Sequence, residues 1–183
     1  MELRRRLLVS VLSNRKLAKL VCISRPKWIL TLYHKARSFS KMQTPCSDYR
    51  ETKGLIYFAR MLDKIRLNAE GRLAPGYFLG VEDPTFFDAR CTRFLGVNYD
   101  ELAARTLEGG SDEQILDWCF AQGRKPGEEE VLIWNSFISK RGWRDESSAD
   151  LETAKKRSGW GDRDDIQTWV DLHDAEEGRT PRR

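Results

Sequence analysis

Short amphipathic segments with recognisable ends are the feature that most restricts how this chain can fold. Within each segment, apolar residues recur at intervals of three and four, which is the period of one face of an α-helix. Polar capping residues precede most segments and glycine follows them, as at Ser111 and Gly123. No segment alternates apolar and polar residues for long enough to indicate a strand. The pattern predicts an all-α fold, a single compact orthogonal bundle of about six to seven short helices.

The helix ends can be placed from the capping residues and glycines. We expect the first helix from about Thr52 to Ala69, with its end at Gly71. The second is expected to start at Asp83 as N-cap, with Pro84 in the first helical position. The remaining expected starts and ends are Asn98 to Gly109, Ser111 to Gly123, Glu128 to Arg141, Ser147 or Ser148 to about Gly159, and Asp164 to Gly178.

Charge is distributed unevenly along the chain. The net charge of +4 combines 32 basic with 28 acidic residues, and residues 1–41 hold 11 of the basic residues but only one acid, Glu2. This segment therefore carries +10, and the remaining 21 basic and 27 acidic residues give the body −6. An acidic body repels phosphates, so nucleic acid is an unfavourable partner for it.

The change from a basic to an acidic sequence at residue 42 suggests a division of the chain into three parts. We expect a basic N-terminal extension at 1–41, a single helical domain at 42–179 and a polar tail at 180–183. Met42 opens a polar lead into the first helix, so one interpretation is that the extension is not part of the native product. The alternatives are a targeting or membrane-surface segment, and an arm that contacts nucleic acid.

The cysteines and the hydropathy indicate a compartment. The four cysteines form no C-x-x-C pair, and two of them, Cys91 and Cys119, lie within amphipathic patterns. A reducing compartment is the simpler interpretation, and no apolar run approaches the roughly 20 residues that span a bilayer. We therefore expect a soluble, cytoplasmic protein.

Six ordered strings of residues look familiar. They are FARMLDKIR at 58–66, RCTRFLGV at 90–97, DWCF at 117–120, WNSF at 134–137, KRGWRD at 140–145, and DDIQT at 164–168 leading to DAEEGR at 174–179. Together these strings, between about Tyr49 and Arg179, resemble a bacterial family known as domain of unknown function 5069. The resemblance implies a bacterial protein that starts near Met42, and it implies no activity.

A charged cluster on the first expected helix is the best candidate for a functional site. Arg60, Asp63 and Arg66 are spaced three apart, so the carboxylate has a cation one turn away on each side, and Lys64 lies beside them. Paired arginines steered by an acid suit an anionic ligand such as a phosphate or a carboxylate. The alternatives are a solvated helix face and a structural network of ion pairs.

Two further residues have both a chemical and a structural interpretation. Cys91 lies between Arg90 and Arg93, which would activate a thiolate, but its spacing from the neighbouring phenylalanines predicts a buried core thiol. His173 beside Asp174 suggests a general base, but its place on an apolar face favours a satisfied, partly buried histidine. The histidines and cysteines show no metal-ligand spacing, so we expect neither a metal nor a cofactor.

These observations leave three functional hypotheses open. The first is a non-enzymatic module that binds an unknown protein or a small anion. The second is an enzyme or sensor whose small anionic substrate is held by Arg60, Asp63 and Arg66. The third is a membrane-surface or nucleic-acid contact through residues 1–41. No nucleotide-binding glycine loop, nucleophile elbow or H-E-x-x-H motif occurs, which disfavours an enzyme, and catalytic residues stay unknown.

Overall fold

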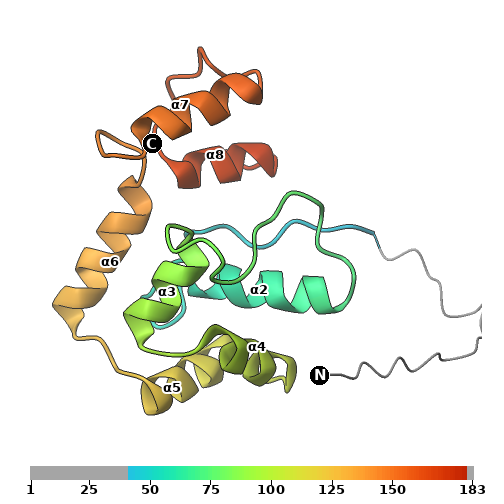
Figure 1. Cartoon of the computed structure of the whole chain (residues 1–183), viewed down its shortest axis with the longest axis vertical. Coiled ribbons are helices and arrows are strands. Elements are labelled where there is room, and N and C mark those ends of the chain that lie inside the picture. Colours follow the sequence, from blue (N-terminus) through green and yellow to red (C-terminus); the bar gives the residue numbers. More distant parts are fainter. Residues whose placement is uncertain (1–40, 181–183) are drawn as a thin grey trace, which may run out of the picture. The chain divides into compact units, whose positions relative to one another are not determined.

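Helices form about half of the described part of the chain, which is residues 41–180 of the computed structural model (Figure 1). Their bounds are α2 (Phe58–Ala69), α3 (Phe87–Leu95), α4 (Tyr99–Leu107), α5 (Asp112–Gln122), α6 (Glu128–Lys140), α7 (Ser148–Arg157) and α8 (Trp169–Glu176). Within residues 41–180 the only strand-like pairings are two isolated bridges, Gln43 with Leu73 and Thr52 with Leu55. The predicted all-α bundle of about six to seven helices is therefore confirmed. The expectations for residues 1–40 and 181–183 lie outside the described residues.

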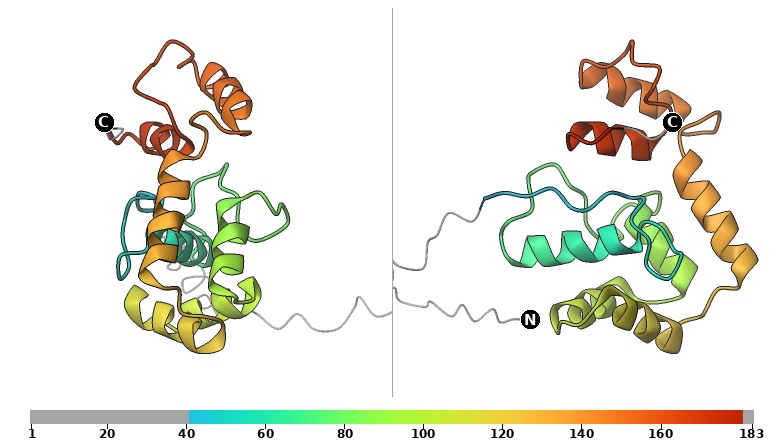
Figure 2. Two further views of the ribbon diagram at one scale, coloured as in Figure 1. Left: turned by 90° about the vertical axis from the view of Figure 1, so that its left-hand side faces the viewer. Right: turned by 180° about the vertical axis from the view of Figure 1, so that it is seen from behind.

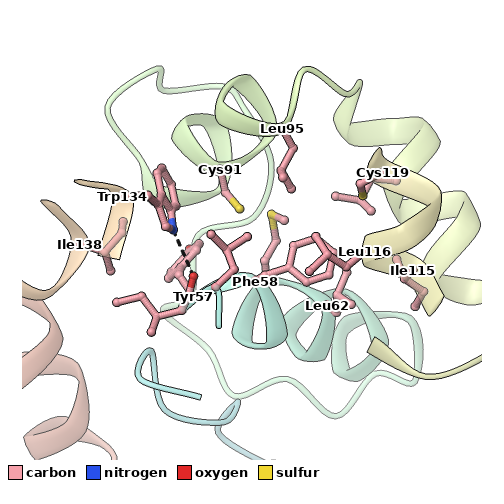
Figure 3. Packing of buried hydrophobic residues seen from close by; sticks show 14 of the residues in the cluster. Tyr57, Phe58, Leu62, Cys91, Leu95, Ile115, Leu116, Cys119, Trp134 and Ile138 are labelled. Carbon is pink, nitrogen blue, oxygen red and sulfur yellow. Dashed lines mark hydrogen bonds between the residues drawn. The ribbon is translucent and has the colours of Figure 1, made fainter. Parts of the chain in front are cut away.

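The main core forms around α2, the central helix of Figure 1. Figure 3 shows how side chains from α3, α5 and α6 converge on the α2 residues Phe58 and Leu62, which are fully buried. Each large apolar side chain buried in this way contributes roughly 1.5–3 kcal/mol relative to an exposed one. Buried members from the other helices are Cys91, Leu95, Leu102, Ile115, Leu116, Cys119, Trp134, Ile138 and Val170.

A second, smaller core joins α7 to α8. Leu151 of α7, Leu172 of α8 and Ile166 from the connection between them are buried together, and Trp160 and Trp169 pack against them. Figure 2 shows α6 running between the end of the domain that holds α4 and α5 and the end that holds α7 and α8. Helix α6 thereby holds the smaller core beside the main one.

Close backbone approach fixes the end of α5 against α3. The Gly123 Cα lies against the last turn of α3, where an added Cβ would come within 2.2 Å of the Leu95 carbonyl oxygen. The next residue, Arg124, donates its backbone N–H to that same oxygen at 2.9 Å. A glycine is required here by space, because any side chain would push the two helices apart.

The first helix begins later than its apolar pattern predicts. The expected start at Thr52 is wrong, because Lys53 and Gly54 adopt positive φ angles of 49° and 81° and form a turn closed by Thr52 and Leu55. Tyr57 also has a positive φ of 72°, which interrupts helical geometry until Phe58. Leu55 is buried through this turn rather than through a helix face.

Two expected N-caps do not cap their helices. Asp83 does not cap α3, because its Oδ1 atom accepts hydrogen bonds from the backbone and hydroxyl of Thr85 in a turn that precedes the helix. Asp164 does not cap α8, because Thr168 takes that position and forms a capping box with Asp171. At Asp83 the local spacing resembles a helix start, but a tight turn competes for the acidic side chain.

The capping residue Ser111 of α5 is confirmed and gives a stability prediction. Its hydroxyl accepts from the Gln114 N–H at 3.3 Å, and the Gln114 side chain accepts from the Ser111 N–H at 2.9 Å. Ser111→Ala is expected to lower the free energy of unfolding by about 1 kcal/mol, since one N–H loses its acceptor. Urea denaturation would measure this against Thr153→Ala, an exposed hydroxyl within α7. Equal effects of the two changes would show that the cap contributes nothing.

Candidate functional site

The predicted cluster on α2 divides into two pairs that face different neighbours. Arg60 and Lys64, one turn apart, point into buried polar surroundings and are 2% and 5% exposed. Asp63 and Arg66 are partly exposed and face the start of α5. The structure therefore does not bring the four side chains together around one ligand.

Arg60 is enclosed by protein acceptors. Its Nη1 atom donates to the Cys46 carbonyl at 2.8 Å and to Glu177 at 3.0 Å, and Nη2 donates to the other Glu177 oxygen at 2.5 Å. Its Nε atom lies 3.4 Å from a carboxylate oxygen of Asp48. The Tyr77 hydroxyl donates to Glu177 at 2.7 Å. This guanidinium joins the segment before α2, α2 itself and the end of α8, and so it serves the fold.

Asp48 connects the same network to His173. The His173 Nδ1 atom lies 3.2 Å from the Asp48 carboxylate, and the imidazole makes an edge contact with Phe87 and a tilted contact with Trp169. Burial alone would raise the pKa of Asp48, but the attraction of His173 and Arg60 outweighs it and lowers that pKa below its usual range. His173 is partly buried with a carboxylate partner, as the structural interpretation of this residue predicts.

Lys64 anchors the loop between α2 and α3. Its ammonium donates to the Phe78 carbonyl at 2.8 Å and to the Tyr57 hydroxyl at 3.2 Å, and it lies 2.8 Å from the Asp88 carboxylate. The second Asp88 oxygen accepts from the Gly80 N–H at 3.1 Å. Buried charges thus hold the backbone on both sides of residue 79, while the Phe78 ring stays 67% exposed.

Asp63 and Arg66 line a cavity of about 250 Å³ between α2 and the start of α5. Asp63 accepts a hydrogen bond from the Cys46 N–H at 2.8 Å, and Arg66 pairs with Asp112 at 2.7 Å. The other lining residues are Arg50, Ala59, Gly110, Ser111 and Glu113. Because the wall carries charges of both signs, the cavity suits a small polar molecule better than a simple anion.

Cys91 is part of the core. Its side chain is fully buried against α2 (Figure 3), and burial raises the pKa of the thiol well above its ordinary value. The prediction of a buried core thiol is confirmed. Among residues 41–180, no three histidine, cysteine or acidic side chains gather in a way that would hold a metal ion.

A pair of arginines on α3 forms a surface that sequence reasoning missed. The Arg90 Nε atom donates to the Thr85 carbonyl at 2.8 Å, and Arg93 Nη2 donates to the adjacent Pro84 carbonyl at 2.6 Å. The Arg90 guanidinium also lies 5.2 Å from the centre of the Phe137 ring. Neighbouring carbonyls therefore hold two like charges next to each other. We call Arg90 and Arg93 the arginine pair.

The spacing on α3 is the signal that would have found this surface. Phe86, Arg90 and Arg93 stand at i, i+4 and i+7, which places them on one stripe of a helix. Sequence reasoning used the two arginines only as neighbours of Cys91, whose side chain points to the opposite, buried face. The carbonyls that orient the guanidinium groups come from a loop that no periodicity describes.

Comparison with protein families assigns the chain to one of them. The family model described as Domain of unknown function (DUF5069) matches residues 42–179. The chain belongs to this family. The match contains the whole Arg60 network, the cavity beside α5 and the arginine pair of the DUF5069 domain. A comparison with curated proteins found no match. Within the described residues, no helix of the DUF5069 domain has the length and apolar character needed to cross a membrane.

The electrostatic surroundings of the arginine pair distinguish it from the other arginines of the DUF5069 domain. Arg141 contacts the same Phe137 ring, but it pairs with Asp145 and Glu146. Within residues 41–180, neither member of the arginine pair forms an ion pair with a carboxylate. Burial first, and then repulsion from Arg141 and Arg93, lower the pKa of the Arg90 guanidinium. Attraction from Glu146 and Asp145 acts in the opposite direction, and the pKa of Arg90 stays lowered.

Proposed function

We propose that the domain is a binding module whose ligand carries an anionic group, and that the arginine pair receives this group. The observation that carries the proposal is the fixed position of two adjacent guanidinium groups that have no carboxylate partner in the described part of the chain. Each group donates one N–H to a loop carbonyl and has further N–H groups that can donate to a ligand. Guanidinium groups with several oriented N–H donors bind phosphate or carboxylate oxygens in a bidentate manner.

The proposal moves the expected anion site from α2 to α3. Arg60 and Lys64 have protein carboxylates as partners, and an anion would have to displace those buried groups. The arginine pair requires no such displacement, because Arg90 is partly exposed and Arg93 exposed. An anion there would also relieve the repulsion among Arg90, Arg93 and Arg141.

Free, buried thiols at Cys91 and Cys119 support a reducing compartment, and the proposed compartment is the bacterial cytoplasm.

We expect phosphate to raise the melting temperature of the wild-type chain and to have no such effect on Arg90→Gln/Arg93→Gln. A ligand that binds only the folded state stabilises it in proportion to its occupancy, and each charge-assisted hydrogen bond contributes about 1.5–3 kcal/mol. Calorimetric melts in phosphate, against sodium chloride at equal ionic strength, measure the difference. Residues 1–41 are present in every variant, so their basic side chains contribute equally.

Arg124→Gln is the matched control for this measurement. Arg124 also lies over an aromatic ring, that of Phe94, and donates to a backbone carbonyl, but it pairs with Glu130. This variant should keep the full phosphate effect. A phosphate effect that survives loss of the arginine pair, or that is absent in wild type, would contradict the proposed function.

A second candidate is the small-substrate hypothesis, now limited to the cavity beside α5. The observation in its favour is that Asp63 and Arg66 both line this space of about 250 Å³, together with Arg50 and Asp112. The same phosphate melts on Arg66→Gln separate the two candidates. Loss of the phosphate effect in this variant, with the effect intact in the arginine-pair variant, would favour the cavity. The hypothesis for residues 1–41 concerns a segment outside the described residues.

A further inference from the structure

An exposed aromatic surface lies directly beside the arginine pair. The Phe78 and Phe86 rings pack at 4.6 Å between centroids with a 33° tilt, and Phe78 is 67% exposed. Phe86 precedes α3 by one residue, and Arg90 and Arg93 follow it on the same stripe. Apolar and cationic groups thus form one continuous surface. We call Phe78, Phe86, Arg90 and Arg93 the α3 surface.

Two sets of contacts hold the α3 surface in place, one at the loop that carries Phe78 and one at the residues before Phe86. Lys64 and Asp88 fix the backbone at Phe78 and two residues later, as the contacts of the buried network show. The arginine pair fixes the carbonyls just before Phe86. A large apolar side chain kept exposed on an ordered loop costs hydrophobic free energy in the isolated domain, and such sites are typical of protein contacts. A preorganised surface also loses little conformational entropy on binding.

We propose that the α3 surface binds an acidic peptide segment of a protein partner, with an apolar side chain seated on Phe78 and Phe86 and a neighbouring carboxylate on the arginine pair. Charge complementarity favours this occupant, because the stripe of α3 that follows Phe86 carries Arg90 and Arg93, and within residues 41–180 neither forms an ion pair with a carboxylate. Two acids, Glu82 and Asp83, lie in the loop before α3, and the Asp83 Oδ1 oxygen accepts two hydrogen bonds from Thr85. The inference rests on the proposed function and names the ligand that carries the anionic group.

Three capped peptides test the inference by fluorescence anisotropy with the full chain at physiological salt. The first carries two glutamates followed by a leucine in a glycine-serine background. The second has glycine in place of the leucine, and the third has glutamines in place of the glutamates. Partial burial of the leucine should make the first peptide bind about fivefold more tightly than the second. The third should bind at least about tenfold more weakly than the first.

Two variants with matched controls assign these effects to the α3 surface. Phe78→Ser should abolish the preference for leucine and leave binding of the glycine peptide unchanged, whereas Leu132→Ser, at a side chain that is 59% exposed on α6, should change neither. Arg90→Gln/Arg93→Gln should weaken both acidic peptides about tenfold, whereas Arg124→Gln should not.

The outcomes separate failure of this inference from failure of the proposed function. Equal affinity of wild type for the leucine and glycine peptides, or a leucine preference that survives Phe78→Ser, would overturn the inference while the phosphate effect stands. If the arginine-pair variant binds both acidic peptides as wild type does and the phosphate effect is also absent, the proposed function and this inference both fail.

Discussion

Arg60→Ala is expected to lower the free energy of unfolding by about 3–5 kcal/mol. The change removes the cation that is shared by the buried carboxylates of Asp48 and Glu177, which are 0% and 3% exposed as side chains. Asp48 keeps its contact with His173, and Glu177 keeps its pair with Arg179. Loss of the shared partner leaves two carboxylates only partly compensated in a poorly solvated place, and this costs several kcal/mol. Urea denaturation followed by circular dichroism measures the change directly.

Arg66→Ala provides the comparison on the same helix. Arg66 has a single carboxylate partner, Asp112, and its side chain is 30% exposed, so solvent screens the pair. We expect a loss of about 1 kcal/mol or less for this change. If Arg60→Ala costs no more than Arg66→Ala, the Arg60 network does not act as a buried structural element.

The penalty for Arg60→Ala should depend on pH in a defined direction. Burial opposes ionisation of Glu177, but hydrogen bonds and attraction from Arg60, together with the Tyr77 hydroxyl, lower its pKa, and the pKa of Asp48 is lowered as well. Groups with lowered folded-state pKa values contribute stability above their unfolded pKa, near 4, and lose it as pH falls through the folded value. The penalty should therefore be constant above about pH 5 and shrink below about pH 4. A penalty that grows on acidification would contradict this assignment.

Trp134→Ala is expected to cost about 3–5 kcal/mol, a large share of the roughly 5–15 kcal/mol available to a domain. The indole is 6% exposed and stacks on Phe94 with 4.8 Å between ring centroids. It donates to the Ile56 carbonyl at 3.2 Å, the hydrogen bond that Figure 3 draws as a dashed line. Its removal leaves a cavity in the main core and an unpaired carbonyl at the turn before α2. The expected result is a lowered denaturant midpoint or a chain that does not fold cooperatively.

Two further changes on α6 separate the causes of this loss. Trp134→Phe keeps an aromatic ring but removes the hydrogen bond to Ile56, so it should cost less than the alanine change, at about 1–3 kcal/mol. Leu132→Ala removes an exposed side chain two residues away and should cost under about 0.5 kcal/mol. A wild-type midpoint for Trp134→Ala would show that this tryptophan does not belong to the core.

The helices could be predicted where local spacing decides the structure. Ser111 caps α5 and Asn98 caps α4 as predicted, because a capping side chain needs only the next three residues. The starts of α2 and α8 could not be predicted in the same way. Tyr57 is held at a positive φ by residues far along the chain, since its hydroxyl donates to Asp88 at 2.7 Å. A contact between residues so far apart in the sequence produces no local pattern from which the start of the helix could be predicted.

The α2 cluster shows why helical spacing alone is a poor guide to a site. At 100° per residue, Arg60 and Arg66 lie about 120° apart around the helix, on opposite shoulders of Asp63. Their partners come from the C-terminal end of the domain for Arg60 and from α5 for Arg66. The spacing predicted that these side chains are grouped, but the tertiary contacts decide which of them share surroundings.

The most direct test of the central claim is a phosphate titration followed by NMR of the arginine Nε–Hε groups of the full chain. The arginine pair should show saturable shifts with one common dissociation constant, while Arg124 and Arg66, which have carboxylate partners, should show none. Saturable shifts at Arg90 and Arg93 alone would establish them as the site of anion binding. Linear, unsaturable shifts across all the arginines, or none at the pair, would contradict the account.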